Sequence, residues 1–149
     1  MIEDNKKITI RQIEKFLYIV DKCFPIPLSE KTDISIYAKK LKEKATICVE
    51  KDKNGNILSM CAGYTENTIN AQAYISLVAT LPESQGQGYG KKLVKEFLDI
   101  AKRKFLRGAH VYAVESNISA MKIYESLGFT RWNLENEPRP KDVHLIYRF

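Results

Sequence analysis

The chain has few of the features that mark exported, membrane-bound or metal-stapled proteins. No apolar stretch approaches the ~20 residues that a helix needs to cross a bilayer, and Met1 to Lys7 lead into no signal-like apolar core. Only three cysteines are present, Cys23, Cys48 and Cys61, with no CxxC pair and no histidine at ligand spacing. This pattern argues against both a disulfide framework and a zinc site. We therefore expect a cytoplasmic protein that holds no metal.

Acidic residues are also in the minority. The chain has 24 Lys and Arg against 18 Asp and Glu, which gives a formal net charge of +6. This balance suits an anionic ligand. The lysine clusters at 39–44 and 91–95 fall in helical stretches and no basic run is interleaved with aromatic residues, so solvated faces are favoured over a nucleic-acid site. Nucleic-acid binding has only the net charge in its favour.

What the chain does contain is the periodicity of one mixed α/β domain over residues 1–149. Helices are expected at 11–22, 33–41, 89–104 (stopped by Gly108) and 117–127, and strands at 46–49, 57–64, 71–81, 109–115, 129–132 and 143–149. A hairpin turn at 52–56 begins an antiparallel meander. Strand 71–81, with apolar residues at successive positions, should be covered on both faces. Together with helix 89–104 and strand 109–115 it forms a parallel βαβ unit.

Three of the seven glycines fall within five residues, Gly86, Gly88 and Gly90, between a strand and a helix. A glycine-rich turn at a helix N-terminus lets backbone N–H groups converge on an anion, in front of the positive end of the helix dipole. The spacing is not that of a Walker loop, because Gly90 and Lys91 are followed by Lys92 instead of Ser or Thr. Nor is it the dinucleotide fingerprint, whose third glycine would fall one residue later. The turn predicts a phosphorylated ligand of another class, with a merely flexible turn as the alternative.

A second motif lies on the helix that follows the βαβ unit. Asn117 stands at its N-terminus, Ala120 and Tyr124 share one face, and Gly128 suits a left-handed C-terminal cap. The helix therefore directs an amide, a methyl group and a phenol toward the end of the parallel strands.

Together the two motifs resemble those of the GCN5-related N-acetyltransferase (GNAT) superfamily. Gln85-x-x-Gly88-x-Gly90 is similar to the family's Arg/Gln-x-x-Gly-x-Gly/Ala acetyl-CoA motif. Asn117 to Phe129 are similar to its Asn-x-x-Ala-x-x-x-Tyr-x-x-x-Gly-Phe helix. The element order agrees from about Ile8 to the C-terminal residue.

The resemblance implies a GNAT-like mixed sheet, with an N-terminal antiparallel meander and a central parallel βαβ unit whose strands splay apart. It implies acetyl-CoA as co-substrate, with the pantetheine arm between the splayed strands and the diphosphate on the glycine turn. The residues that it assigns to the cofactor are Val78, Ala79, Thr80, Gln85, Gly86, Gln87, Gly88, Tyr89, Gly90, Lys91, Asn117 and Tyr124. Lys92 is a further candidate for charge near the phosphates.

The implied reaction is direct acetyl transfer to an amine of a small molecule or a peptide. Tyr124 would be the catalytic acid that protonates the departing thiolate. Relatives often carry a carboxylate base on the strand before the glycine turn, where this chain has Ser76. Alternatives are a water chain, an acceptor that arrives deprotonated, or one of Glu66, Glu115, His110 and His144.

Two further expectations concern the acceptor and the assembly. Segments 23–28 and 132–140 should wall the acceptor pocket, with Trp132 either stacked on a substrate or packed in the core. The missing carboxylate supports a different reading, in which the chain binds acyl-CoA without turnover as a sensor or an assembly subunit. A homodimer is left open.

Overall fold

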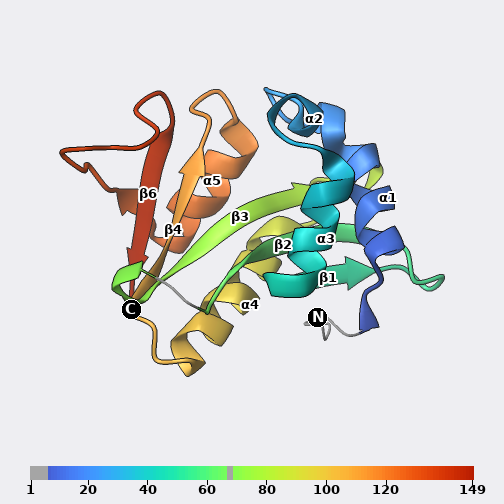
Figure 1. Ribbon diagram of the computed structural model, residues 1–149, viewed down its shortest axis with the longest axis horizontal. Helices are drawn as coiled ribbons and strands as arrows, with labels where there is room; N and C mark the ends of the chain where they lie inside the picture. The colour runs from blue at the N-terminus through green and yellow to red at the C-terminus, as the bar shows by residue number, and fades with distance from the viewer. Residues whose placement is uncertain (1–6, 67–68) are drawn as a thin grey trace.

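The structure is a computed structural model that describes residues 7–66 and 69–149. Residues 1–6, on which the expectation of no export signal rests in part, lie outside these ranges. A six-stranded sheet in the order β1-β2-β3-β4-β6-β5 carries helices on both faces (Figure 1). Its strands are β1 (Thr46–Lys51), β2 (Ile57–Tyr64), β3 (Gln72–Thr80), β4 (Gly108–Ala113), β5 (Thr130–Arg131) and β6 (Val143–Arg148). The α-helices are α1 (Ile10–Val20), α2 (Leu28–Lys31), α3 (Ile34–Lys44), α4 (Tyr89–Arg103) and α5 (Ile118–Leu127), and the 3₁₀ turns are η2 (Asp21–Cys23), η3 (Ile69–Ala71) and η4 (Pro82–Ser84).

The predicted topology is confirmed. β1, β2 and β3 form an antiparallel meander, and β3, α4 and β4 form a parallel βαβ unit. Helix α2 was not expected, because Pro25 and Pro27 signalled only a loop. Among the described residues, none of the helices combines the length and the apolar character that a membrane span requires.

The parallel pair β3–β4 is short, and this positions the site. Pairing runs only from Gln72 opposite Gly108 to Ile75 opposite Val111. β3 continues to Thr80 without β4 beside it, so the two strands part, as the family resemblance implied. The edge of β3 that faces β4 is therefore unpaired over its last five residues.

A β-bulge at Ser76 coincides with this parting. Leu77 pairs with Ala62 and Ile75 with Gly63, so Ser76 is an extra residue in β3 with no partner in β2. A bulge bends its strand and increases the local twist, which turns the end of β3 away from β4.

The bulge also exchanges the two faces of β3, because a slip of one residue reverses every following side chain. Ala73 and Ile75 belong to the core under α4 and α5, whereas Leu77 and Ala79 belong to the core under α1 and α3. The expectation that this strand is covered on both faces is wrong, since buried and partly exposed positions alternate along it. Four of the partly exposed side chains line cavities: Tyr74, Ser76, Val78 and Thr80.

The core under α4 contains Cys48 and Cys61, both fully buried, as the sequence indicated. Burial raises the pKa of the Cys48 thiol to about 12 and that of Cys61 well above its usual value. Both thiols stay protonated at neutral pH and act as small apolar residues.

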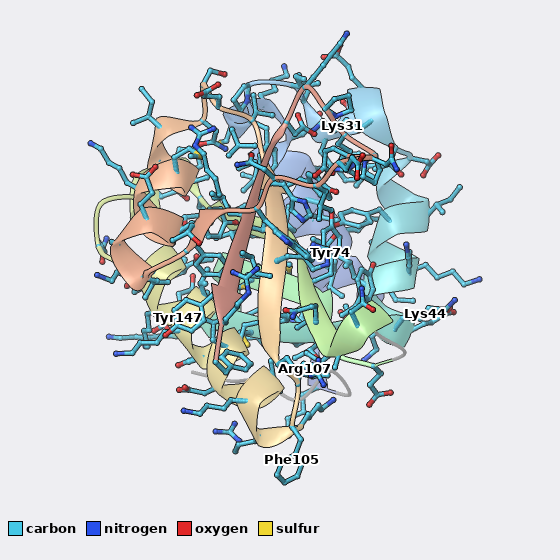
Figure 2. The ribbon with its side chains drawn as sticks, turned by 90° about the vertical axis from the view of Figure 1, so that its left-hand side faces the viewer. Lys31, Lys44, Tyr74, Phe105, Arg107 and Tyr147 are labelled. Atoms are coloured by element: carbon cyan, nitrogen blue, oxygen red, sulfur yellow. The ribbon has the colours of Figure 1, made fainter. Side chains whose placement is uncertain are left out.

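The end of α4 differs from the prediction that Gly108 stops it. The helix ends at Arg103, and Phe105 takes a left-handed φ of 63° and projects into solvent (Figure 2). Gly108 is already the first residue of β4. It must be glycine there because a Cβ would collide with the backbone of β6 at Tyr147.

Candidate active site

The glycine turn uses its three glycines for two different reasons. Gly86 and Gly88 have φ values of 82° and 80°, in the left-handed region that favours glycine. Gly90 has no such backbone, but a Cβ there would lie 2.8 Å from Cδ1 of Ile123 on α5. The turn therefore combines a sharp backbone reversal at Gly88, the N-cap of α4, with a close approach of α4 to α5.

The backbone amides of this turn are free to bind a ligand. The first bond of the α4 ladder is donated by Lys92 N to Gly88 O at 3.1 Å, and no side chain caps the helix. Within residues 7–66 and 69–149, no protein acceptor takes the N–H groups of residues 86–91. Unpaired amides at a helix N-terminus, with the helix dipole behind them, form an anion site.

A cavity of about 320 Å³ lies over these amides. Ten of the residues expected at the cofactor line it: Val78, Ala79, Thr80, Gln85, Gly86, Gly88, Tyr89, Gly90, Lys91 and Asn117. Gln87 is exposed and does not line it, and Lys92 pairs with Glu50 at 3.1 Å instead. Cys23, Phe24, Ser84 and Ser119 also line this cavity, although neither motif placed them at the cofactor. The segment before α2 and the start of α5 close over the cavity, and Ser84 is the last residue of η4, just before the glycine turn.

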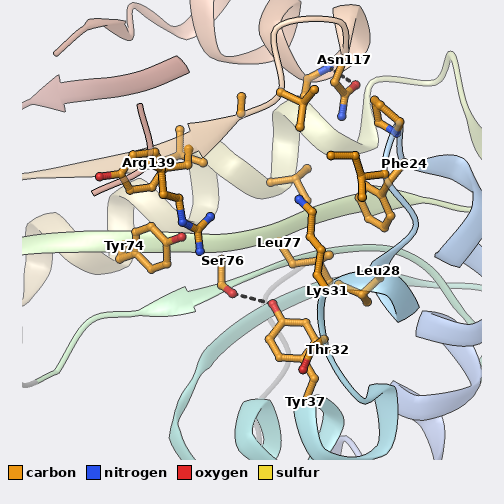
Figure 3. A pocket seen from close by; sticks show the side chains of 18 of the residues that line it. Phe24, Leu28, Lys31, Thr32, Tyr37, Tyr74, Ser76, Leu77, Asn117 and Arg139 are labelled. Atoms are coloured by element: carbon orange, nitrogen blue, oxygen red, sulfur yellow. Dashed lines mark hydrogen bonds between the residues drawn. The ribbon is translucent and has the colours of Figure 1, made fainter. Parts of the chain in front are cut away.

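A second cavity, of about 350 Å³, opens where β3 and β4 part (Figure 3). It shares four lining residues with the first cavity: Phe24, Val78, Asn117 and Ala120. The two cavities therefore adjoin at the start of α5, which is where a donor in one would meet an acceptor in the other.

Two predicted residues stand on α5 beside this junction. Asn117 caps the helix, with its Oδ1 accepting the Ala120 N–H at 3.3 Å, so its amide nitrogen remains available as a donor (Figure 3). Tyr124 lines the second cavity, is 3% exposed, and packs its ring edge-on against Phe129 with centroids 5.3 Å apart. Burial raises the pKa of its phenol well above the usual value, so the group stays protonated at neutral pH.

The expected walls of the acceptor pocket are only partly found in the second cavity. Phe24, Pro25, Ile26 and Leu28 line it, but from the loop at 132–140 only Arg139 does. Trp132 packs against the rings of two histidines, His144 at 4.9 Å and His110 at 5.7 Å between centroids. It is therefore a packing residue in this structure.

The alternative general bases do not line the second cavity. Glu66 pairs with Lys104 at 3.3 Å and Glu115 with Arg131 at 3.2 Å, both at exposed sites. Ser76 is in the cavity wall, where its hydroxyl and that of Tyr37 are 2.5 Å apart.

The two histidines belong to a hydrogen-bonded chain next to the cavity. His110 Nδ1 and His144 Nε2 are 2.8 Å apart, as are His144 Nδ1 and Glu137 Oε2. Tyr112, which lines the cavity, donates its hydroxyl to Glu137. Burial and the neighbouring His144 lower the pKa of His110 to about 4, so its ring is neutral at pH 7. No sequence pattern linked Glu137 and Tyr112 to the histidines, because these hydrogen bonds join residues from β4, from β6 and from the loop before β6.

Comparisons with known proteins agree with this fold and site. The sequence model of the Acetyltransferase (GNAT) family matches residues 13–129. The mycothiol acetyltransferase of Streptosporangium roseum is 36% identical over 74 residues, which are 50% of this chain and 19% of that protein. The chain thus spans about a fifth of the length of the curated mycothiol acetyltransferases that it matches.

Solved structures share the fold over nearly the whole chain. A GNAT-family acetyltransferase of Staphylococcus aureus superposes with a TM-score of 0.76 at 13% identity, over 99% of this chain and 96% of that one. The PaiA N-acetyltransferase of Thermoplasma acidophilum, solved in complex with coenzyme A, gives a TM-score of 0.70 at 14% identity, over 96% of each chain. With the family match over residues 13–129, the resemblance seen in the two motifs is confirmed: this chain belongs to the GNAT acetyltransferase family.

Proposed function

We propose that the chain is an acetyl-CoA-dependent acetyltransferase that moves an acetyl group directly to an amine of a small molecule or a peptide. One observation carries the proposal: two cavities meet at the start of α5, one lined by free amides and the other open for an acceptor. Holding two reactants side by side in this way accelerates their reaction without any covalent enzyme intermediate.

The lining of the first cavity fits the parts of coenzyme A. The free amides of residues 86–91 and the ammonium group of Lys91 suit a diphosphate. The unpaired edge of β3 at Val78, Ala79 and Thr80 presents main-chain groups that suit the amides of a pantetheine arm. When bound, acetyl-CoA supplies the activated acetyl group as a thioester.

The residues at the junction suit the two remaining tasks, which are to orient the acyl group and to protonate the leaving sulfur. The Asn117 amide can donate a hydrogen bond into the junction. Tyr124 keeps its proton at neutral pH, so its hydroxyl can donate a hydrogen bond to the sulfur and share its proton as negative charge develops there while the C–S bond breaks. Tyr124 is therefore our candidate for the catalytic acid.

The test of the proposal is release of free coenzyme A thiol from acetyl-CoA in the presence of a panel of amines. Tyr124→Phe should lower kcat by about 100-fold, the lower end of the range for a lost general acid, and change the affinity for acetyl-CoA by less than about twofold. Tyr18→Phe, at an exposed tyrosine of α1, is the matched control and should leave both unchanged. Equal turnover by the wild-type protein and Tyr124→Phe would remove the acid role.

A non-catalytic acyl-CoA sensor or assembly subunit is the second candidate, because no Asp or Glu is found among the described residues that line the acceptor cavity. Such a protein would be stabilised by acetyl-CoA and would release no thiol with any amine.

The cytoplasm stays the proposed location, in keeping with three free cysteines. A homodimer stays a prediction, which light scattering of the purified protein would test.

A further inference from the structure

The acceptor cavity has a one-sided charge. Its described lining includes three cations, Lys31, Lys40 and Arg139, and no carboxylate. The remaining polar lining consists mainly of hydroxyl groups, from Thr32, Tyr37, Tyr64, Tyr74, Ser76, Tyr112 and Tyr124. A site built for a cationic or polyamine acceptor would need carboxylates to pair with the additional positive charges.

The two lysines stand on the helical wall of the cavity. Lys31 is the last residue of α2 and extends into the cavity (Figure 3). Lys40 comes from α3, and its Nζ lies 5.2 Å from the centroid of the Tyr64 ring. In the described part of the chain, no carboxylate pairs with either ammonium group. Their charges therefore remain available to a ligand.

Arg139 faces the cavity from a different wall, the loop before β6 (Figure 3). Its guanidinium carbon lies 5.1 Å from the centroid of the Tyr112 ring. Glu137 fixes this loop, because its carboxylate accepts a hydrogen bond from the Tyr112 hydroxyl and pairs with His144. The same carboxylate accepts the backbone N–H of Arg139 at 3.5 Å. Asp142 reaches the guanidinium only at 4.0 Å and does not line the cavity, so it leaves most of the five donors unused.

We propose that the acceptor is a small molecule carrying both the reacting amine and an anionic group, a carboxylate or a phosphate, which binds between Lys31 and Arg139. The inference rests on the proposed function and names the class of acceptor for the same site. A cavity of about 350 Å³ matches a small molecule. Arg139 suits both anions because its planar guanidinium pairs with carboxylate and phosphate alike.

The same cations account for the missing base. An amine that accepts an acetyl group must first lose its proton, and nearby positive charges disfavour the ammonium form. The cations therefore lower the pKa of an amine held beside them. An anionic group anchors the acceptor, and the uncompensated positive charge then helps to release the proton to solvent.

The test compares amines that differ only in their anionic group. Serine against serinamide tests the carboxylate, O-phosphoethanolamine against ethanolamine tests the phosphate, and putrescine supplies a dication. With thiol release as the assay, kcat/KM should be at least about tenfold higher for the anionic member of one pair, and putrescine should react most slowly. Lys31→Gln and Arg139→Gln should each reduce this preference about threefold or more. Lys95→Gln, which removes the same charge from an exposed position on α4, should not.

Calorimetry keeps this inference separate from the proposed function. The same pairs are titrated into the protein saturated with coenzyme A, so that preference is measured without turnover. Tighter binding of an anionic member, weakened in Lys31→Gln and Arg139→Gln, supports the inference even if no thiol is released and the proposed function fails. Neutral or dicationic amines that bind or react as well as their anionic counterparts would overturn the inference even if acetyl transfer is established.

Discussion

Gly88 and Gly55 offer a matched pair of substitutions that tests the anion site on the glycine turn. Gly88 has φ 80° and Gly55, in the β1–β2 turn, has φ 82°. A Cβ built on either residue meets no atom within 4 Å. Replacement by alanine therefore costs only the strain of the left-handed backbone, about 1 kcal/mol in each case. For a chain of this size, that lowers Tm by roughly 2–4 °C.

The two variants should differ in ligand binding. To relieve the strain, the turn at Gly88 must rotate peptide units whose amides are free for an anion. A hydrogen bond to a charged group contributes about 1.5–3 kcal/mol, so loss of one weakens coenzyme A binding by about tenfold or more. Gly55→Ala should bind coenzyme A as the wild-type protein does.

Denaturant unfolding gives the free energy of unfolding of each variant, and calorimetric titration with coenzyme A gives its Kd. If Gly88→Ala loses the same stability as Gly55→Ala and still binds coenzyme A with wild-type affinity, then the amides of residues 86–91 do not hold the diphosphate. Gly86→Ala, with φ 82° and equally open space around its Cβ, provides an independent repeat of the comparison.

Two other substitutions test the packing and the partly buried His110. Gly63→Ala should lower the free energy of unfolding by about 3 kcal/mol or more, since its Cβ would lie 2.7 Å from the Phe97 ring and against the backbone of Tyr74; a loss as small as that of Gly55→Ala in denaturant unfolding would contradict this packing. His110 has a pKa of about 4 in the fold against an ordinary value of 6.5, so the unfolded chain binds the proton first and stability falls as the pH drops from 6.5 toward 4. Denaturant unfolding measured from pH 6.5 to pH 4 should show that the free energy of unfolding falls by about 1–3 kcal/mol less in His110→Asn than in the wild-type protein. Equally steep falls in the two proteins would refute the lowered pKa of His110.

Local sequence patterns were enough to predict most of the fold and one of the two cavities. The amphipathic spacing of α4 and the turn chemistry at Gly88 are set by neighbours in the chain, so both could be predicted. The length of β5 was overestimated, because its pairing with β6 covers only two residues. Helix α2 was missed because two prolines precede it, although a proline at the N-cap of a helix breaks no ladder bond.

The acceptor side was less predictable because its chemistry comes from distant segments. Lys31 and Arg139 are 108 positions apart in the sequence, and neither belongs to a periodic pattern. Glu137 could not be linked to Tyr112 or His144 without the path of the loop before β6. Long-range pairing of single polar residues leaves no local signal, whereas hydrophobic periodicity repeats in every turn or strand.

The extra residue at Ser76 means that the opening in the sheet depends on chain length more than on side-chain identity. A serine, alanine or threonine at this position would keep the count of residues in β3 and with it the gap beside β4. Excising the residue would instead make Ile75 and Leu77 neighbours, with Leu77 still opposite Ala62 and in its present layer, and would let the parallel ladder extend. A one-residue deletion could thus turn a cleft-bearing sheet into a continuous one, while point substitutions there would tune only the wall of the cleft.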